Sequence, residues 1–333
     1  MTATTRRKLA AVLLATVIFG CLGAVTTAAV RRPVEIGALN ALLIGAGIGL
    51  FEEFYVQSPR GDWMRAMHPL RSIFIYILVV IVLYLVALHL THVLLGRLDD
   101  LPVVYRRLPY GIAFFTAFSI VGILMMRVAH FIGLRALFDL IIGTYHRPIA
   151  ERKVLLFLDI NGSTALGERL GALTMRALVR KFLSDLSQPI VGNGGEIYLY
   201  KGDGLIAVWN FADAITGAAI LRAVDAMYGT IARERPAYEQ AFGVAPVFRI
   251  GIHGGDVIVS EQGDARRSIG IYGDAINIAA RMEEAARAHN VRCVISAAVA
   301  DALSDHTRIR AIGVEQVKGI SAPIPICEYV PSS

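Results

Sequence analysis

The sequence has few cysteines and few charged residues, and both shortages limit what the protein can be. Its three cysteines, Cys21, Cys293 and Cys327, show no spacing typical of disulfide pairing or of a metal site, so we interpret them as reduced, buried residues of a cytosolic domain. Only 18% of the residues are charged and 55% are hydrophobic, which excludes a single soluble domain. The net charge of +6 comes mostly from arginines beside apolar segments, so we expect no nucleic-acid partner.

The excess of hydrophobic residues lies before about residue 140. We therefore predict an N-terminal all-α transmembrane bundle over residues 1–130, embedded in the lipid bilayer. A span needs roughly 20 apolar residues, and about four segments approach that length. They are residues 9–30, 34–51, 73–95 and 109–127. The second is short and glycine-rich, so three spans are the alternative. Basic residues on both sides favour a cytoplasmic N-terminus only weakly.

Three histidines lie in or beside the predicted spans. His89 and His92 are three residues apart on one helical face, and His130 follows the fourth span. Such histidines could hold a haem or relay protons, whereas the simpler interpretation places them at the membrane interface, where imidazole reaches water. The spans lack a charged midplane pathway, so a transporter has little support. Beyond them, apolar spacing predicts a connecting helix over residues 131–150.

Residues 151–333 are numerous enough to bury a core of their own. Their periodicity alternates between strand and helix patterns, which predicts a mixed sheet covered by helices, an α/β class. Strands are predicted over residues 154–160, 196–201, 205–210, 248–260, 267–272 and 291–296, with two more around Lys318 and Gly319. Helices are predicted over residues 174–186, 212–235, 275–289 and 297–304, and another begins after residue 164.

Two aspartates stand where a strand meets a glycine-containing turn. Asp159 follows the apolar strand, and Asp203 lies in the turn of a predicted hairpin. A carboxylate at the end of a buried strand is costly unless its charge is offset, so the pair suggests one metal site. Mg²⁺ prefers such oxygen ligands shared with substrate phosphates. Either aspartate alone would be better explained as a turn cap, but the two together favour the metal site.

Two further groups of residues indicate phosphate chemistry. Gly162, Ser163 and Thr164 lead into a helix, where free backbone N–H groups form an anion site suited to phosphate. Asn277 and Arg281 are four residues apart and share a helix face. An amide and a guanidinium there could position a ribose and neutralise a transferring phosphoryl group. The alternative, a capping asparagine and a surface arginine, stays open on these residues alone.

Residues 157–164, 201–204 and 272–281 together resemble the three signatures of class III nucleotide cyclases. The order and spacing agree, and the similarity covers roughly residues 150–330. The resemblance implies a ferredoxin-like domain of βααββαβ type. It also implies a homodimer with catalytic sites at the subunit interface, where ATP is converted to 3′,5′-cyclic AMP and pyrophosphate. Because ATP is cytosolic, the catalytic domain would face the cytoplasm from an inner or plasma membrane.

The same resemblance implies roles for particular residues. Asp159, Ile160 and Asp203 of one subunit would bind two Mg²⁺ or Mn²⁺ ions. The partner subunit would supply an asparagine and an arginine, matched here by Asn277 and Arg281, to orient the ribose and stabilise the transition state. Gly162, Ser163 and Thr164 would bind substrate, and Lys318 matches a lysine that contacts the triphosphate.

Two positions depart from the adenylate cyclase pattern. Leu199 stands where a lysine is usual, and Gly270 stands where an aspartate or threonine is usual, so neither makes the expected hydrogen bond to adenine. ATP is favoured on family frequency. Our hypothesis is that Lys201, on the same strand face as Leu199, partly substitutes for that lysine, although a solvent-facing or phosphate-facing Lys201 is the simpler interpretation.

Other activities remain as alternatives. A guanylate cyclase is one, and a catalytically degenerate domain that binds nucleotide or dimerises under control of the membrane half is another. Retention of both aspartates together with Asn277 and Arg281 argues against degeneracy. A diguanylate cyclase is disfavoured, because Gly202-Asp203-Gly204 does not match the hairpin motif of that family.

Overall fold

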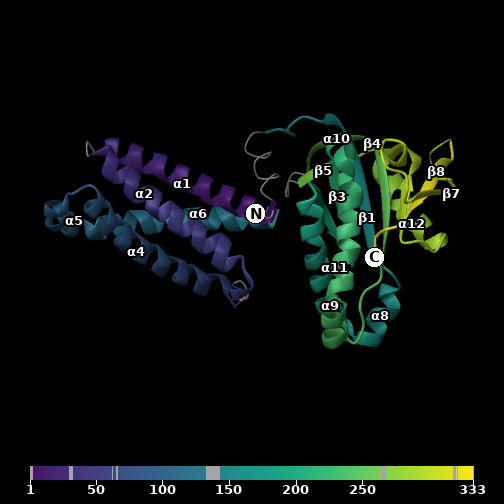
Figure 1. Cartoon of the computed structure of the whole chain (residues 1–333), viewed down its shortest axis with the longest axis horizontal. Coiled ribbons are helices and arrows are strands. Elements are labelled where there is room, and N and C mark those ends of the chain that lie inside the picture. Colours follow the sequence, from purple (N-terminus) through teal and green to yellow (C-terminus); the bar gives the residue numbers. More distant parts are fainter. Residues whose placement is uncertain are drawn as a thin grey trace. The chain divides into compact units, whose positions relative to one another are not determined.

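The computed structural model describes residues 3–29, 33–61, 63–64, 67–132, 143–263, 268–317, 320 and 322–332. The chain forms two compact units, a helical unit (Met1–Phe138) and an α/β unit (Asp139–Ser333), and each is described by itself (Figure 1). Half of the predicted connecting helix of residues 131–150, residues 133–142, lies outside the described residues, and residues 131–132 end α6. Of its remainder, residues 143–147 form turns and β1 already begins at Ile149, so the helix prediction is wrong for that part.

Four long helices make up most of the helical unit, and each overlaps one predicted span. They are α1 (Ala3–Ala29), α2 (Val34–Leu50), α4 (Pro69–Leu94) and α6 (Leu108–Ile132), with shorter elements η1 (Phe51–Val56), η2 (Pro59–Gly61), η3 (Leu98–Asp100) and α5 (Leu101–Arg106). Two helices in the described part of the chain, Val34–Val56 and Arg71–Leu94, are long and apolar enough to cross a membrane. The apolar helices Ala15–Ala29 and Leu108–Phe118 are shorter.

Small residues allow α1 and α2 to pack closely. They recur at every fourth position of α2, as Gly37, Ala41, Gly45 and Gly49. A Cβ added at Gly37 would stand 2.7 Å from the carbonyl oxygen of Gly23, and one at Gly45 would stand 2.8 Å from Cβ of Phe19. Such small-residue stripes bring helix backbones together where dispersion contacts, rather than burial of large side chains, provide the attraction.

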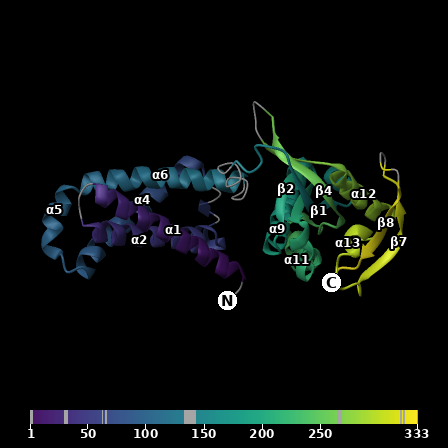
Figure 2. The same cartoon turned by 90° about the horizontal axis from the view of Figure 1, so that it is seen from above.

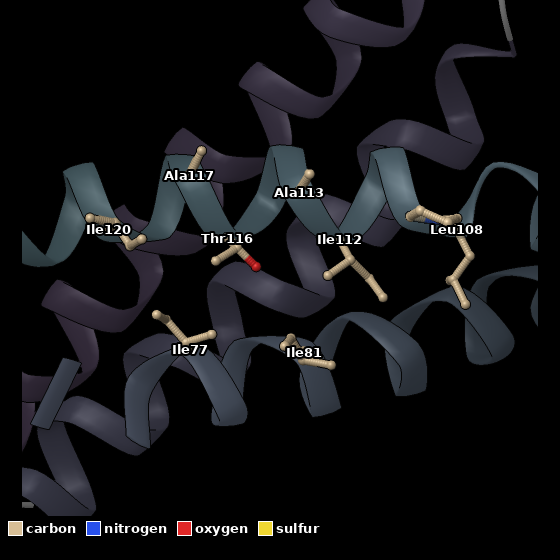
Figure 3. A pocket seen from close by; sticks show the side chains of 9 residues that line it. Ile77, Ile81, Leu108, Ile112, Ala113, Thr116, Ala117 and Ile120 are labelled. Carbon is tan, nitrogen blue, oxygen red and sulfur yellow. The ribbon is translucent and has the colours of Figure 1, made fainter. Parts of the chain in front are cut away.

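Helices α4 and α6 leave a shallow apolar groove between them, with a volume of about 610 Å³ (Figure 3). Ile77 and Ile81 of α4 face Ile112 and Thr116 of α6 across it. The Thr116 hydroxyl is buried and has no hydrogen-bond partner within the described part of the chain.

Two of the three singled-out histidines can be placed, whereas the His130 side chain lies outside the described residues. The Nδ1 atoms of His89 and His92 donate to the carbonyl oxygens of Leu85 and Leu88, each at 2.8 Å. His89 is exposed and bonds through Nε2 to the Tyr105 hydroxyl. His92 is only 3% exposed, which contradicts the expectation that it reaches water at an interface. Cys21 is also exposed, contrary to the expectation that all three cysteines are buried.

The α/β unit contains one eight-stranded sheet in the order β2-β3-β1-β4-β6-β8-β7, with β5 paired to β4. The strands are β1 (Ile149–Ile160), β2 (Glu196–Lys201), β3 (Gly204–Asn210), β4 (Phe248–Gln262), β5 (Ser268–Tyr272), β6 (Cys293–Ser296), β7 (Ile309–Glu315) and β8 (Ile324–Tyr329). The helices are α8 (Ser163–Leu170), α9 (Ala172–Gly192), α10 (Phe211–Ile215), η4 (Thr216–Ala218), α11 (Ala219–Phe242), α12 (Asp274–Ala288) and α13 (Ala297–Ala300). Strands β4 and β6 are parallel and the other pairs are antiparallel, so the predicted mixed α/β class is confirmed.

The helix predicted over residues 212–235 is broken in the structure. Helix α10 ends at Ile215, and Gly217 and Ala218 adopt left-handed backbone angles, with φ values of 58° and 54°. Helix α11 then begins at Ala219. Apolar periodicity continues across this break, which is why the sequence pattern did not reveal it.

Strand alternation in β1 decides which side chains reach which face of the sheet. Leu156 and Leu158 belong to the core that includes α9 and α11, and these two helices lie side by side in both views (Figures 1 and 2). Leu155 and Phe157 belong to a second cluster with Ala275 and Ala279 of α12. Asp159 has the same parity as Leu155, so it lies on the α12 face of the sheet.

Candidate functional site

The register of the sheet brings the two predicted aspartates together. Asp159 is the penultimate residue of β1, and Asp203 lies in the turn between β2 and β3. Because Leu158 of β1 pairs with Leu205 of β3, the turn ends beside Asp159. A Cβ at Gly204 would stand 2.2 Å from the carbonyl oxygen of Leu158 and 3.1 Å from Oδ1 of Asp159. Only glycine therefore allows this approach.

The two carboxylates leave an unbalanced negative charge. Burial, followed by the neighbouring Asp203, raises the pKa of Asp159, while Arg287 acts against that rise. Oδ2 of Asp203 is buried and has no hydrogen-bond partner in the part of the chain that the structure describes. A buried, unpartnered carboxylate oxygen beside a second carboxylate fits a divalent cation.

The protein supplies few ligands for such an ion. The described residues contain no cluster of three or more histidine, cysteine, aspartate or glutamate side chains arranged for a metal. Mg²⁺ sites commonly use one or two carboxylates, with substrate phosphates and water completing the shell. The side chain of Ile160 is buried in the core, so only its backbone can take part, and its backbone hydrogen bond acts to lower the pKa of Asp159.

The turn after Asp159 has the geometry of an anion site. Gly162 adopts a left-handed conformation with φ of +63° and precedes the first residue of α8, Ser163. The first N–H groups of a helix lack intrahelical partners, and Gly162 caps α8 without a side-chain hydrogen bond. Ser163 is half-buried and Thr164 is exposed. These backbone groups can therefore bind phosphate oxygens close to the two carboxylates.

Asn277 and Arg281 lie on a different part of the site. Both are exposed on α12, and Arg281 pairs with Glu284. Arg287, not Arg281, reaches Asp159. The two arginines are about 120° apart around the helix axis. Within one subunit, the described contacts therefore do not bring Asn277 and Arg281 to the aspartates.

The positions that depart from the adenylate cyclase pattern lie on β2 and β5. Leu199 is 48% exposed, and its unbroken register with Lys201 puts both on one face, as strand periodicity predicts. Tyr200 bonds to Ser187 of α9 at 3.1 Å, so Leu199 and Lys201 face the opposite side. Gly270 is buried, and a Cβ there would stand 2.7 Å from the Tyr272 ring. Lys318 lies outside the described residues.

The family of the chain follows from its similarity to known proteins. A sequence model described as the adenylate and guanylate cyclase catalytic domain matches residues 148–329. The chain belongs to this family. "Adenylate cyclase 2" of Rhizobium meliloti is 32% identical over 199 residues, which cover 59% of this chain and 55% of the relative. "Adenylate cyclase" of Anabaena cylindrica is 29% identical over 187 residues, covering 54% of this chain and 36% of the relative.

The cyclase chain thus spans about half, or less, of the length of these curated relatives. A bacterial light-regulated adenylyl cyclase of known structure has the same fold, with a TM-score of 0.57 at 21% identity. That similarity covers 65% of this chain and 64% of the other. The recognition of a class III cyclase domain from three short motifs is therefore confirmed.

Two residues close to Asp159 were not predicted from the sequence. Nη2 of Arg287 lies 3.5 Å from Oδ2 of Asp159 and 3.8 Å from Oε1 of Glu283. Glu283 is half-buried, and burial, followed by the charge of Asp159, raises its pKa. The sequence does show that Glu283 and Arg287 are four residues apart on a predicted helix. Such charge pairs are common on helix surfaces, so the spacing alone did not indicate a site.

Proposed function

We propose that this protein is a membrane-anchored adenylate cyclase that converts ATP to 3′,5′-cyclic AMP and pyrophosphate as a homodimer. The observation that carries the proposal is the convergence of Asp159 and Asp203, one with an unpartnered buried oxygen, beside a phosphate-binding turn. Membership of the cyclase family and the similarity to named adenylate cyclases support it.

The reaction is attack of the ribose 3′-hydroxyl on the α-phosphorus of the same nucleotide. Asp159, Asp203 and the backbone of Ile160 would hold two Mg²⁺ or Mn²⁺ ions, which when bound supply positive charge to the attacking oxygen and the leaving pyrophosphate. Backbone N–H groups of Gly162, Ser163 and Thr164 would bind the phosphate chain. Lys318 would add a contact to the triphosphate by family resemblance. These groups position the reactants and stabilise charge without forming a covalent intermediate.

The exposure of Asn277 and Arg281 supports a site shared between two subunits. Both side chains are exposed and no described contact joins them to the aspartates of their own chain, so they are available to a second copy. There the Asn277 amide would orient the ribose, and the Arg281 guanidinium would neutralise the transferring phosphoryl group. Each subunit then contributes half of two equivalent sites, as a two-fold dimer requires.

The helical unit would hold the enzyme in a lipid bilayer. Val34–Val56 and Arg71–Leu94 are long enough to cross it, and the helices expose large apolar side chains on their outer faces. We propose four spans within residues 1–130. The cyclase domain, residues 151–333, would lie in the cytoplasm because ATP is found there.

Subunit complementation tests this function directly. Full-length protein in detergent micelles should form cyclic AMP when it is supplied with ATP and Mn²⁺, and a parallel reaction with GTP measures cyclic GMP. Asp159→Ala and Arg281→Ala should each be inactive. Co-expression of the two variants should restore about a quarter of wild-type activity, because half of the dimers then contain one intact site of two. No cyclic product from the wild type with either nucleotide would contradict the enzyme, and failure of complementation would contradict the shared site.

A guanylate cyclase is the second candidate, because neither Leu199 nor Gly270 offers a side-chain hydrogen bond to adenine. The ratio of cyclic AMP formed from ATP to cyclic GMP formed from GTP in the same assay decides between them. We further propose that Lys201 partly replaces the missing lysine. Lys201→Ala should then raise KM for ATP and change the ATP/GTP preference, and unchanged values would show that it does not contact the base.

A further inference from the structure

Four charged residues from three parts of the fold lie around Asp159 at the proposed metal site. Asp203 comes from the β2–β3 turn, and Arg249 is the backbone register partner of Asp159 on β4. Glu283 and Arg287 come from α12. Of these, Arg287 forms the ion pair with Asp159, at 3.5 Å. The family signatures assign no role to Arg287 or Glu283.

We propose that Arg287 is a built-in counter-cation that competes with the divalent metal for Asp159 and turns to Glu283 when the metal binds. The inference rests on the proposed function, because it requires a metal at Asp159 and Asp203. Arg287 is a positioning residue in this scheme, since it acts through Asp159 and not on the substrate.

The arrangement gives Arg287 two alternative acceptors. Its Nη2 atom lies 3.5 Å from Asp159 and 3.8 Å from Glu283, and both contacts are longer than a close charge-assisted hydrogen bond. Its side chain is 62% exposed, whereas that of Glu283 is only 13% exposed. The mobile partner is therefore the arginine, and Glu283 is a fixed acceptor one helical turn away.

Electrostatic repulsion prevents Arg287 and the divalent metal from binding Asp159 at the same time. A Mg²⁺ ion binds carboxylate oxygen at about 2.1 Å, so a guanidinium beside the same oxygen would face its double positive charge. Without the metal, Arg287 offsets the repulsion between Asp159 and Asp203. With the metal, that compensation is no longer needed and Glu283 receives the guanidinium. The metal ion thus replaces the Arg287 guanidinium as the positive charge beside Asp159.

A purely structural role predicts something different. If Arg287 and Glu283 were only a surface pair on α12, removing the arginine would slightly weaken the helix and leave metal affinity unchanged. Arg235 and Glu239 on α11 provide a matched case, because they have the same four-residue spacing, at 3.6 Å, on an element without the aspartates.

Mn²⁺ titration of the full-length protein in detergent, without nucleotide and followed by electron paramagnetic resonance, tests the inference. Arg287→Gln should bind Mn²⁺ about three- to tenfold more tightly than wild type at low salt, with a smaller difference at high salt. Without metal its melting temperature should fall, and Mn²⁺ should raise it more than in wild type. Arg287→Lys, which keeps the charge, should stay within twofold of wild type, as should Arg235→Gln.

A second variant protects the test if Arg287→Gln folds poorly. Glu283→Gln removes the alternative acceptor, so Arg287 stays on Asp159 and Mn²⁺ affinity should fall about threefold. Wild type that binds Mn²⁺, with Arg287→Gln or Glu283→Gln unchanged from it, overturns this inference alone. A wild type that binds no Mn²⁺ overturns the proposed metal site and the inference with it.

Discussion

The two units of the chain differ in the side chains they expose and in the residues at their closest helix contact. The α/β unit places large side chains inside, such as Trp209 and Phe182, with exposures of 2% and 0%. In the helical unit, α2 faces α1 with glycine and alanine, while large residues recur on the outside of α4 at four-residue intervals. They are Phe74, Leu78, Val82 and Val86, with exposures of 77%, 61%, 51% and 57%.

Water and the hydrocarbon of a bilayer favour these two kinds of packing for different reasons. In water, a continuous apolar face of this kind is unfavourable unless something covers it. In hydrocarbon, burial of large side chains gives no driving force, and helices associate through close packing of small residues. The contrast therefore supports the proposed bilayer location of the helical unit from its packing, independently of hydropathy.

Among the described residues, the two units also differ in where buried polar atoms lack a hydrogen-bond partner. In the helical unit they are distributed over three helices, at Asn40, Thr91, His92 and Thr116. In the α/β unit the corresponding atom is Oδ2 of Asp203, at the proposed metal site. Even buried Lys153 bonds there to Asn210 at 2.7 Å. In the α/β unit an unpaired polar atom thus marks the site, whereas in the helical unit it does not.

The largest effect should come from placing a charge on the outer face of α4. Val82→Asp should disfavour membrane insertion by about 3 kcal/mol, because a carboxylate near the middle of a span loses its hydration. Val314→Asp on β7, where Val314 is 63% exposed, should change stability by less than about 0.5 kcal/mol. Membrane-fraction yield measures the first effect and thermal unfolding the second. Equal tolerance of both substitutions would remove the distinction between the two units.

Acid should weaken the α/β unit selectively through His253. Burial lowers the pKa of His253 from 6.5 to about 4, and its Nδ1 lies 2.8 Å from the Ser296 hydroxyl. Because the unfolded chain takes up the proton first, stability should fall as pH drops from about 6.5 towards 4, by about 2 kcal/mol at pH 5. Near-ultraviolet circular dichroism during unfolding would measure this. His253→Gln should flatten the dependence, and an unchanged slope would mean that another group is responsible.

A glycine inside a helix should matter for packing where α1 meets α2 and not at an open position of α11. Gly37→Ala forces a Cβ against Thr27 and the backbone of Gly23, so it should destabilise the helical unit by about 2 kcal/mol. Gly229, inside α11, has nothing within 4 Å of an added Cβ, so Gly229→Ala should stabilise the α/β unit by about 0.5–1 kcal/mol. Unfolding in detergent measures both. The same sign for the two substitutions would contradict the packing difference.

A smaller loss of stability than that of Gly37→Ala is expected at the C-terminal end of the α/β unit. Asp225 accepts bonds from Arg308 at 2.7 Å, from the Tyr329 hydroxyl at 2.9 Å and from the backbone N–H of Ser332 at 2.9 Å. Burial alone would raise the pKa of Asp225, but these donors outweigh it and the net shift is downward. Asp225→Asn should cost about 1.5 kcal/mol at pH 7, measured by urea unfolding. The loss should shrink as acid protonates the wild-type carboxylate, and a loss independent of pH would indicate a packing effect instead.

Local patterns determined much of the fold and the positions of the proposed site residues. The apolar run placed Asp159 at the end of β1, and the glycine-containing turn placed Asp203 between β2 and β3. The helical period placed Asn277 and Arg281 on one face of α12. Each of these features depends on neighbours within one element, so the sequence contains the information.

Only the tertiary structure decided which distant charges meet. The sequence did not reveal that Arg287 and Glu283 reach Asp159, because the pairing of β1 with β4 and the packing of α12 on the sheet join residues far apart in the chain. Nor did it reveal the left-handed break at Gly217, where apolar periodicity runs on, or the burial of His92. A sequence period fixes the face on which a side chain lies, whereas its partner depends on the packing of elements against each other.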